Sequence, residues 1–229
     1  MDQSNPPRLS GLQNRSLREQ VLDVLRESIL DGEFRPGQPL IETELASQLQ
    51  ISRAPLREAM RVLSAEGLLE TVPYRGTTVK ALTKTDIEEL YSLRGVLESF
   101  AIQRIIARNE ANDMAHLKSI YANMLDAAEK GDLKRLNIED QVFHTTLMEL
   151  SYHSLLLSIW NMVSMRVRQV MALRNQQNNN ITQIAYNHLP ILEAMIARDS
   201  ERATSLIQEH VASAGDIIID EWEYVEDSP

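Results

Sequence analysis

The sequence predicts a mostly α-helical protein with an N-terminal winged helix-turn-helix domain and a C-terminal all-α antiparallel bundle. Residues 42–67 have the spacing of two short helices joined by a tight turn, and two short β-favouring runs follow them. From Thr83 onward, apolar residues recur at helical spacing almost throughout. We therefore expect a disordered arm at 1–10, a DNA-binding domain at 11–81 and an all-helical domain at 82–229.

The helix-turn-helix prediction depends on residues 42–67. Residues 42–49 have the pattern of the first helix, and residues 50–51 form the turn. Ser52 suits the N-cap of the second helix, and Gly67 suits the left-handed residue that ends it. Two helices joined in this way are typical of a DNA-binding motif in which the second helix enters the major groove.

The second helix of this pair has two different faces. At about 100° per residue, one broad arc carries the apolar side chains of Leu56, Ala59, Met60, Val62 and Leu63. A separate arc carries Arg53, Ala54, Arg57 and Arg61. Arginines four residues apart repel each other, whereas phosphate oxygens and guanine edges pair with guanidinium groups. We expect this arc to contact DNA; the alternative is an exposed arginine face partly paired with Glu58 and Glu66.

A wing is expected after the helix pair. Residues 68–72 and 77–81 favour β-structure, and Pro73-Tyr74-Arg75-Gly76 between them supplies turn chemistry. A hairpin here would lay Arg75 and the backbone of Gly76 along a minor groove, where the negative potential of DNA is concentrated.

Charge and composition restrict the function classes. The net charge is −10, but residues 1–80 carry 10 Lys/Arg against 11 Asp/Glu, whereas residues 81–229 carry 13 against 22. The acidic excess therefore lies in the C-terminal part, and a local basic patch remains able to bind DNA. The chain has no cysteine, which excludes disulfides and thiolate chemistry. It has no apolar signal core or apolar run of about 20 residues, so we expect a soluble cytoplasmic protein without a membrane partner.

The remaining elements are helices. Residues 17–30 have apolar side chains at helical spacing before Gly32, and 35–37 form a turn into the helix pair. Pro190 removes an amide hydrogen, so the fifth C-terminal helix is either bent or begins later. Six C-terminal helices are expected, at about 83–108, 111–130, 132–151, 154–177, 182–198 and 200–223.

The N-terminal segments resemble the GntR family of bacterial transcription regulators. The matching pieces are LREQVLDVLRESILDGEFRPG, LIETELASQLQISRAPLREAMRVLSAEGLLE and YRGTTV. They follow the family pattern of a helix before a PG turn, an S-R-x-P-x-R-E-A recognition helix and an RG wing. The resemblance implies DNA contact by Arg53, Arg57 and Gly76. Thr43 stands where some members carry a basic residue, which leaves part of the base readout and the operator sequence open.

The C-terminal part resembles the FCD ligand domain of the FadR-like subfamily, in segments YSLRGVLESFAI, DQVFH and NHLPILEAMIARD and in a histidine of the last helix. Six helices would place it near the VanR-type group. Asp140 and His144 lie four residues apart on one helix face, and His188 and His210 lie among apolar residues in separate helical segments. Each histidine alone is equally compatible with an ordinary hydrogen-bonded residue.

The resemblance implies that Asp140, His144, His188 and His210 hold a divalent metal. Three nitrogens and one carboxylate suit Zn, Ni or another divalent transition metal and leave coordination positions for water or a small metabolite's carboxylate. Arg94, in Leu93-Arg94-x-x-x-Glu98, is expected to face the bundle interior. A buried arginine needs an anion, which is either Glu98 or a bound acid.

We expect a homodimeric transcription repressor that reads a palindromic operator in double-stranded DNA and responds to a small organic acid. One alternative is a regulator for which the metal itself is the signal. The other is a metal-dependent hydrolase, which we do not favour because Glu139 and Glu209 each precede a ligand and point about 100° away from it. The short connection between Ala81 and Thr83 predicts that movement of the next helix is carried to the wing.

Overall fold

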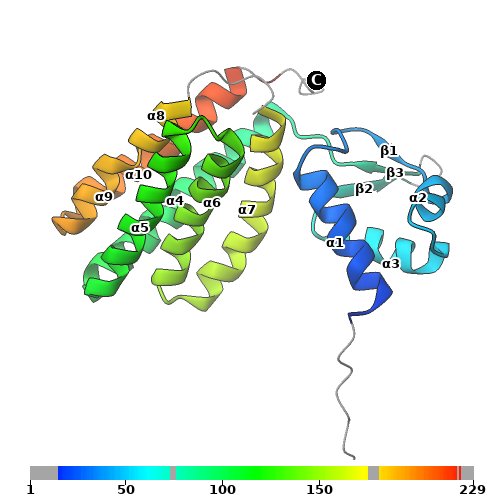
Figure 1. Ribbon diagram of the computed structural model, residues 1–229, viewed down its shortest axis with the longest axis horizontal. Helices are drawn as coiled ribbons and strands as arrows, with labels where there is room; N and C mark the ends of the chain where they lie inside the picture. The colour runs from blue at the N-terminus through cyan, green and yellow to red at the C-terminus, as the bar shows by residue number, and fades with distance from the viewer. Residues whose placement is uncertain (1–14, 73–75, 175–180, 221, 223–229) are drawn as a thin grey trace, which may run out of the picture.

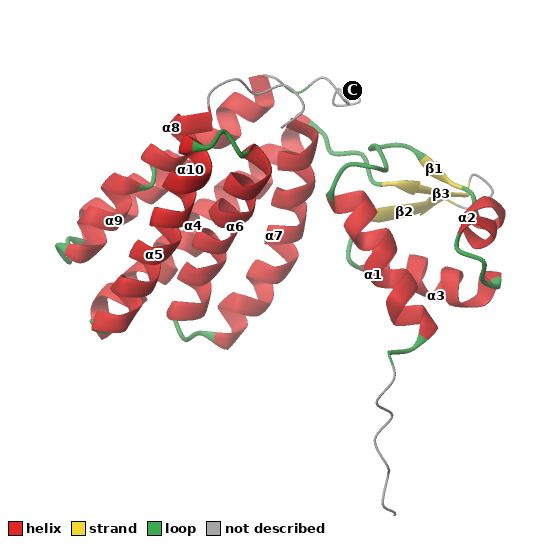
Figure 2. Cartoon of the chain, viewed as in Figure 1, coloured by secondary structure: helices red, strands yellow, loops and turns green. Residues whose placement is uncertain are grey.

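The computed structural model describes residues 15–72, 76–174, 181–220 and 222. The arm expected at 1–10 and Arg75 of the wing lie outside these residues. Figures 1 and 2 show a small domain of helices and strands beside a larger bundle made of helices. The mostly α-helical class predicted from the sequence is confirmed.

The N-terminal domain is a helical layer with a small antiparallel sheet. The strand order is β1-β3-β2, and Thr71 of β2 lies opposite Thr77 of β3. Its elements are α1 (Leu17–Leu30), β1 (Pro39–Leu40), α2 (Glu42–Gln48), α3 (Arg53–Ala65), β2 (Leu69–Val72) and β3 (Gly76–Val79). The sequence did not predict β1, because two residues are too few to show a strand pattern.

The end of α3 has the geometry that its glycine predicts. Gly67 has φ +76°, and its N–H donates to the carbonyl of Ser64 at 3.1 Å. The N–H of Leu68 donates to the carbonyl of Leu63 at 2.9 Å, which completes a Schellman cap. At the other end, Ser52 occupies the N-cap with extended backbone, although its side chain makes no capping hydrogen bond.

We expect Gly67→Ala to destabilise the protein by about 1–2 kcal/mol, because a side chain in left-handed backbone is strained. The added methyl would also meet the guanidinium of Arg166 on α7. Gly37→Ala is the matched control, since Gly37 has nearly the same φ (+75°) with no heavy atom near its missing Cβ. Urea unfolding of both variants separates the backbone cost from the contact. A loss at Gly67 smaller than that at Gly37 would contradict this account.

The C-terminal domain is built from long helices. Its elements are α4 (Lys84–Arg108), α5 (Ala111–Glu129), α6 (Leu133–Leu150), α7 (Ser154–Arg174), α8 (Ile181–Tyr186), α9 (Leu189–Ile196) and α10 (Ser200–Asp220). A capping box between Thr83 and Asp86 begins α4. Across the described ranges, no helix is both long and apolar enough to span a membrane.

The fifth helix expected at 182–198 is divided, which corrects the expected count of six. In the described part of the chain, α4–α10 form seven helical segments. Pro190 lies in the first turn of α9, where a missing N–H costs no helical hydrogen bond. The chain therefore restarts a helix at Leu189, and His188 lies in the turn before it.

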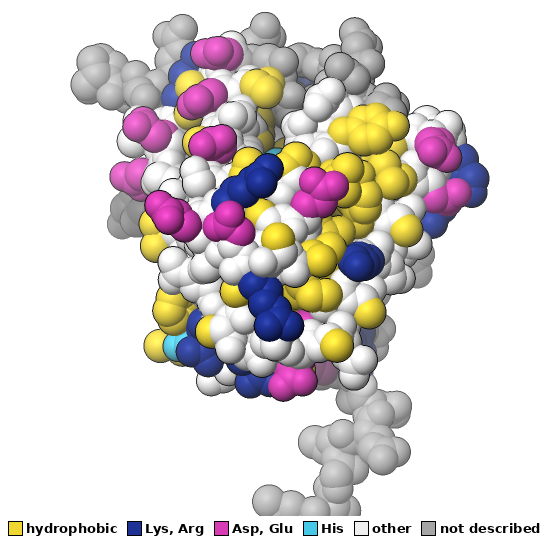
Figure 3. Space-filling view, turned by 90° about the vertical axis from the view of Figure 1, so that its left-hand side faces the viewer, with side chains coloured by type: hydrophobic (Ala, Val, Ile, Leu, Met, Phe, Trp, Pro, Cys, Tyr) yellow, Lys and Arg dark blue, Asp and Glu magenta, His cyan; other side chains and the backbone are white. Residues whose placement is uncertain are grey.

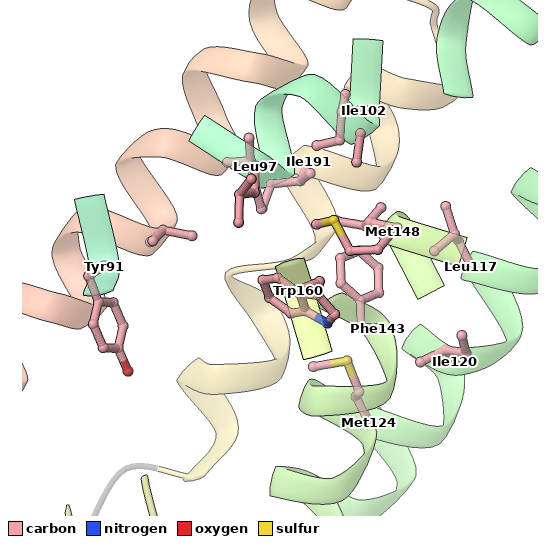
Figure 4. Close-up of a cluster of buried hydrophobic side chains, with 14 of the residues drawn as sticks. Tyr91, Leu97, Ile102, Leu117, Ile120, Met124, Phe143, Met148, Trp160 and Ile191 are labelled. Atoms are coloured by element: carbon pink, nitrogen blue, oxygen red, sulfur yellow. The ribbon is translucent and has the colours of Figure 1, made fainter. Parts of the chain in front are cut away.

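The bundle core surrounds the segment that carries the predicted ligands. Figure 4 shows Phe143, Met148 and Trp160 among side chains from the neighbouring helices. Phe143 is fully buried and directly precedes His144. The apolar packing therefore fixes the face of α6 on which the polar ligands lie.

The two domains contact each other along α7, which lies next to α1 (Figure 1). Met165 of α7 packs against the apolar core of the N-terminal domain. The linker between β3 and α4 is also fixed to the bundle, because the indole N–H of Trp222 donates to the carbonyl of Leu82 at 2.8 Å. Contact between the domains is therefore made through side chains of α7 as well as through the short linker.

Candidate functional site

The predicted DNA-contacting residues form one exposed surface. Arg53, Ala54, Arg57 and Arg61 are all exposed on α3. On the opposite face of α3, Leu56, Ala59, Met60 and Leu63 are buried, and Val62 is half-buried. Thr43 is exposed on α2, and Gly76 is exposed at the start of β3 with φ +92°. The arginine face therefore faces solvent and is available for a ligand.

One arginine of this face has a partner in the free protein. The Nε–H of Arg57 donates to the carboxylate of Glu42 at 2.7 Å, and the two side chains are 52% and 32% exposed. An exposed ion pair contributes only about 0–1 kcal/mol. A phosphate or a guanine edge can therefore replace Glu42 at little cost.

The four predicted metal ligands come together in the bundle. The Nε2 atoms of His144 and His188 are 3.2 Å apart, and Asp140 Oδ1 lies 3.2 Å from His188 Nε2 and 3.8 Å from His144 Nε2. The ring of His210 lies 4.4 Å from that of His188 and stacks on His144 at 5.4 Å. Nitrogen donors of the three histidines lie within 4.8 Å of one another. Two nitrogens bound to one Zn²⁺ at tetrahedral angles would be about 3.3 Å apart.

Hydrogen bonds on the outer side of two rings fix which nitrogen faces inward. His188 Nδ1 lies 2.9 Å from the carbonyl oxygen of Ile184, which can only accept, so Nδ1 carries a hydrogen. His144 Nδ1 lies 2.5 Å from the Glu98 carboxylate and donates in the same way. The neutral form of each ring then directs an Nε2 lone pair at the other. A metal ion between the two rings would accept both lone pairs.

The electrostatics of the cluster also suit a cation. Burial raises the pKa of Asp140, but His144, His188 and Arg94 outweigh it and hold that pKa well below its ordinary value. Burial lowers the pKa of His144, and burial together with the neighbouring histidines lowers the pKa of His210 well below its ordinary value. These directions favour an ionised carboxylate at Asp140 and neutral imidazoles at His144 and His210, which are the forms that bind metals.

Arg94 and Glu98 form a buried pair behind the ligands. Arg94 is 4% exposed, and its Nε–H donates to Glu98 at 2.6 Å. Of the two anions that the sequence left open for Arg94, the internal one is therefore present. The sequence did not reveal that Glu98 also holds His144, because nothing in the spacing of α4 shows its contact with α6.

A cavity of about 650 Å³ opens beside the cluster. Arg94, Asp140 and His144 line one part of it, and side chains of α7 such as Trp160 line another. Its size falls in the range of small-molecule sites. An acid bound there would reach both the metal ligands and Arg94.

The two carboxylates next to ligands in sequence have other contacts. Glu139 accepts a hydrogen bond from Asn123 at 3.3 Å, and Glu209 is exposed and accepts one from Ser205 at 3.1 Å. Neither carboxylate is turned toward the cluster, as expected from its position on the helix.

Two family models match the chain. The model described as bacterial regulatory proteins, gntR family, matches residues 17–79, and the model of the FCD domain matches residues 89–213. The first match covers the helix pair and the wing, and the second covers Arg94 and the four residues predicted to bind a metal.

The chain is similar over most of its length to proteins described as transcriptional repressors and, in its fold, to a solved structure. A protein of Paenarthrobacter nicotinovorans described as a probable D-xylose utilization operon transcriptional repressor is 31% identical over 202 residues, or 88% of each chain. The gluconate operon transcriptional repressor of Bacillus subtilis (strain 168) is 26% identical over 92% of this chain and 88% of its own. The structure of E. coli McbR/YncC has the same fold, with a TM-score of 0.77 at 24% identity over 92% of this chain and 100% of that one.

Proposed function

This chain belongs to the GntR family of bacterial transcription regulators, with an FCD domain at its C-terminal side, and we propose that it is a metal-containing repressor released or engaged by an organic acid. DNA-binding transcription regulation is the function of the family, and it is not an enzymatic one. The metallohydrolase alternative is therefore set aside. In this proposal, residues 11–81 bind DNA. Residues 82–229 bind the metal and the effector and form the dimer.

The exposed arginine face of α3 is the observation that supports operator binding. Arg53, Ala54, Arg57 and Arg61 would enter the major groove, with Thr43 beside them on α2. Gly76 and Arg75 would follow the adjacent minor groove. Arginine forks contacting guanine edges would supply the sequence preference, whereas contacts to phosphates would supply affinity that falls with salt.

The facing Nε2 atoms of His144 and His188 support the metal. Together with Asp140 and His210 they would hold a divalent transition ion, Zn or Ni by the chemistry of the donors. The bound ion would supply a Lewis-acidic position for a carboxylate. Arg94, already at the cavity wall, would bind the same acid through its guanidinium. The cavity beside the cluster favours this function over a regulator that senses metal alone.

The bundle also supports the homodimer. Leu93, Val96 and Phe100 share one stripe of α4 and are 45%, 62% and 41% exposed. Apolar side chains also gather on the bundle face shown in Figure 3. Exposed apolar surface of this kind is typical of an interface. A two-fold dimer would present two α3 helices to a palindromic operator in the cytoplasm, where the DNA is.

Selection from a pool of random DNA duplexes tests this function. Purified full-length protein should enrich an inverted repeat, because a symmetric dimer reads two half-sites. Protein purified without chelator should also carry about one divalent ion per chain by mass spectrometry. Failure to enrich any sequence would refute operator binding, and an ion-free protein that does not take up Zn²⁺ or Ni²⁺ would refute the metal site.

A further inference from the structure

Arg168 of α7 belongs both to the cavity and to the contact between the domains. Its side chain lines the cavity. Its guanidinium also binds two carboxylates of α1: Nη1 and Nη2 lie 3.2 and 2.5 Å from the oxygens of Glu27, and Nη2 lies 2.7 Å from Asp31. We call these three residues the latch. The latch joins the DNA-binding domain to the wall of the effector cavity.

The cavity is shared between the domains. Leu30, Asp31 and Glu33, at the end of α1 and just after it, line the cavity on one side. Arg94, Asp140 and His144 on its other walls belong to the bundle. An occupant therefore contacts the DNA-binding domain only while α1 is in the position seen here. A ligand whose contacts differ between two domain arrangements must shift the balance between them.

Movement of α1 would be carried directly to the recognition helix. Arg26 of α1 makes two hydrogen bonds to Glu66 at the end of α3, at 2.7 and 3.1 Å. The two helices also share the apolar core, in which Leu25 and Ile29 of α1 and Leu63 of α3 are buried. Release of α1 from α7 would therefore move the DNA-contacting face with it.

The cavity wall indicates a polar occupant with more than one anchoring group. The side-chain oxygen of Asn137 is buried at this wall and has no hydrogen-bond partner within the described ranges. Such an oxygen needs a donor, which an ionised carboxylate does not have, so a water molecule bound with the occupant would pair with it. Three basic side chains line the cavity: Arg94 beside Asp140 and His144, Lys134 in the first turn of α6, and Arg168 beside α1. Of these, Arg168 is the one whose guanidinium is bound to carboxylates of the DNA-binding domain.

We propose that the effector is a dicarboxylic acid whose second carboxylate takes Arg168 from Glu27 and Asp31 and so releases the latch. This inference rests on the proposed function, in which the first carboxylate binds at the metal and Arg94. Glu27 and Asp31 are 55% and 52% exposed, so replacing them with another carboxylate exchanges similar ion pairs. While α1 stays in place, Asp31 and Glu33 repel the incoming anion. Both effects favour the arrangement in which α1 has moved away.

The test compares acids that differ by one carboxylate. Calorimetry on zinc-loaded full-length protein would titrate butanoate against succinate, hexanoate against adipate, and octanoate against suberate. In at least one pair, we expect the dicarboxylate to bind about tenfold tighter, as a charge-assisted pair to arginine implies. Arg168→Gln should remove that preference, so that the two acids of each pair bind with similar affinity.

Neutralising Glu27 and Asp31, the two carboxylates of the latch, should have the opposite effect on dicarboxylate affinity. Glu27→Gln with Asp31→Asn should raise dicarboxylate affinity by about three- to tenfold, because the competing carboxylates are gone. Monocarboxylate affinity should rise less, because that acid gains only from the lost repulsion by Asp31. Arg135→Gln is the matched control, since Arg135 of α6 forms a partly exposed ion pair with Asp126 of α5 and does not line the cavity. It should change neither acid.

Different results would contradict the latch and the proposed acid-binding site. Binding of monocarboxylates with no preference for a dicarboxylate would overturn the role of Arg168 and leave the acid site standing. A dicarboxylate preference that survives Arg168→Gln, or that weakens when Glu27 and Asp31 are neutralised, would also overturn the latch. If no acid of either kind bound, both the latch and the proposed effector site would fall.

Discussion

His210→Ala is expected to cut Zn²⁺ affinity by more than the roughly 10–100-fold that loss of an outer-shell partner costs. The same change should lower the thermal midpoint only when metal is present. Metal at about 100 times its Kd stabilises the folded state by about 2.7 kcal/mol, or roughly 5–10 °C for a chain of this length. His210 is suited to this test because it is only half-buried.

His116→Ala is the control for that experiment, since His116 is exposed on α5 away from the cluster. It should change neither zinc affinity nor the midpoint. Asp140→Asn should behave as His210→Ala does, because it removes the ionised ligand with almost no change of shape. Equal loss of stability in the metal-free and zinc-loaded forms would instead make His210 an ordinary packing residue.

Arg57→Ala is expected to weaken binding to the selected operator by about 1–3 kcal/mol, or about 5–150-fold, while the fold remains intact. The fold should survive because Arg57 is exposed and its pair with Glu42 contributes little. Fluorescence anisotropy with labelled duplex at one fixed salt concentration gives the affinity. Arg53→Ala on the same face should weaken binding similarly.

Arg202→Ala separates a specific contact from a change of net charge. Arg202 is exposed on α10, in the other domain, so its loss removes one positive charge and no predicted DNA contact. Its operator affinity should stay within about twofold of the parent protein, given the screening of distant charges. Parent-like affinity of Arg57→Ala would mean that α3 is not the recognition helix.

Local pattern was sufficient to predict most of the fold. The helix at 17–30 and the left-handed Gly67 follow from apolar spacing and capping chemistry, which depend on neighbours in sequence. The division between α8 and α9 was harder to place, because Pro190 is compatible with a bend as well as with a new helix start. Strand β1 has no pattern of its own and exists only because β3 pairs with it.

That Asp140 and His144 lie together could be predicted from the sequence, whereas the side chains that contact them could not. Residues four apart on one helix, such as Asp140 and His144, must share a face. Glu98 and His144 contact each other across two helices and are 46 residues apart in sequence. Arg168 and Glu27 pair across the two domains and are 141 residues apart. Such contacts depend on how the elements pack, which spacing along the chain does not encode. We expected movement of the bundle to be carried to the wing through the short linker. The contacts of α7 with α1 provide a second route between the two domains.

We infer that metal and acid in the bundle together control binding of DNA by α3. The experiment measures the operator affinity of the full-length protein in three states: metal-free, with Zn²⁺, and with Zn²⁺ and a saturating dicarboxylate. We predict that the dicarboxylate changes affinity by about 5–150-fold and that it does so only when zinc is present. The same operator affinity in all three conditions would contradict the claim.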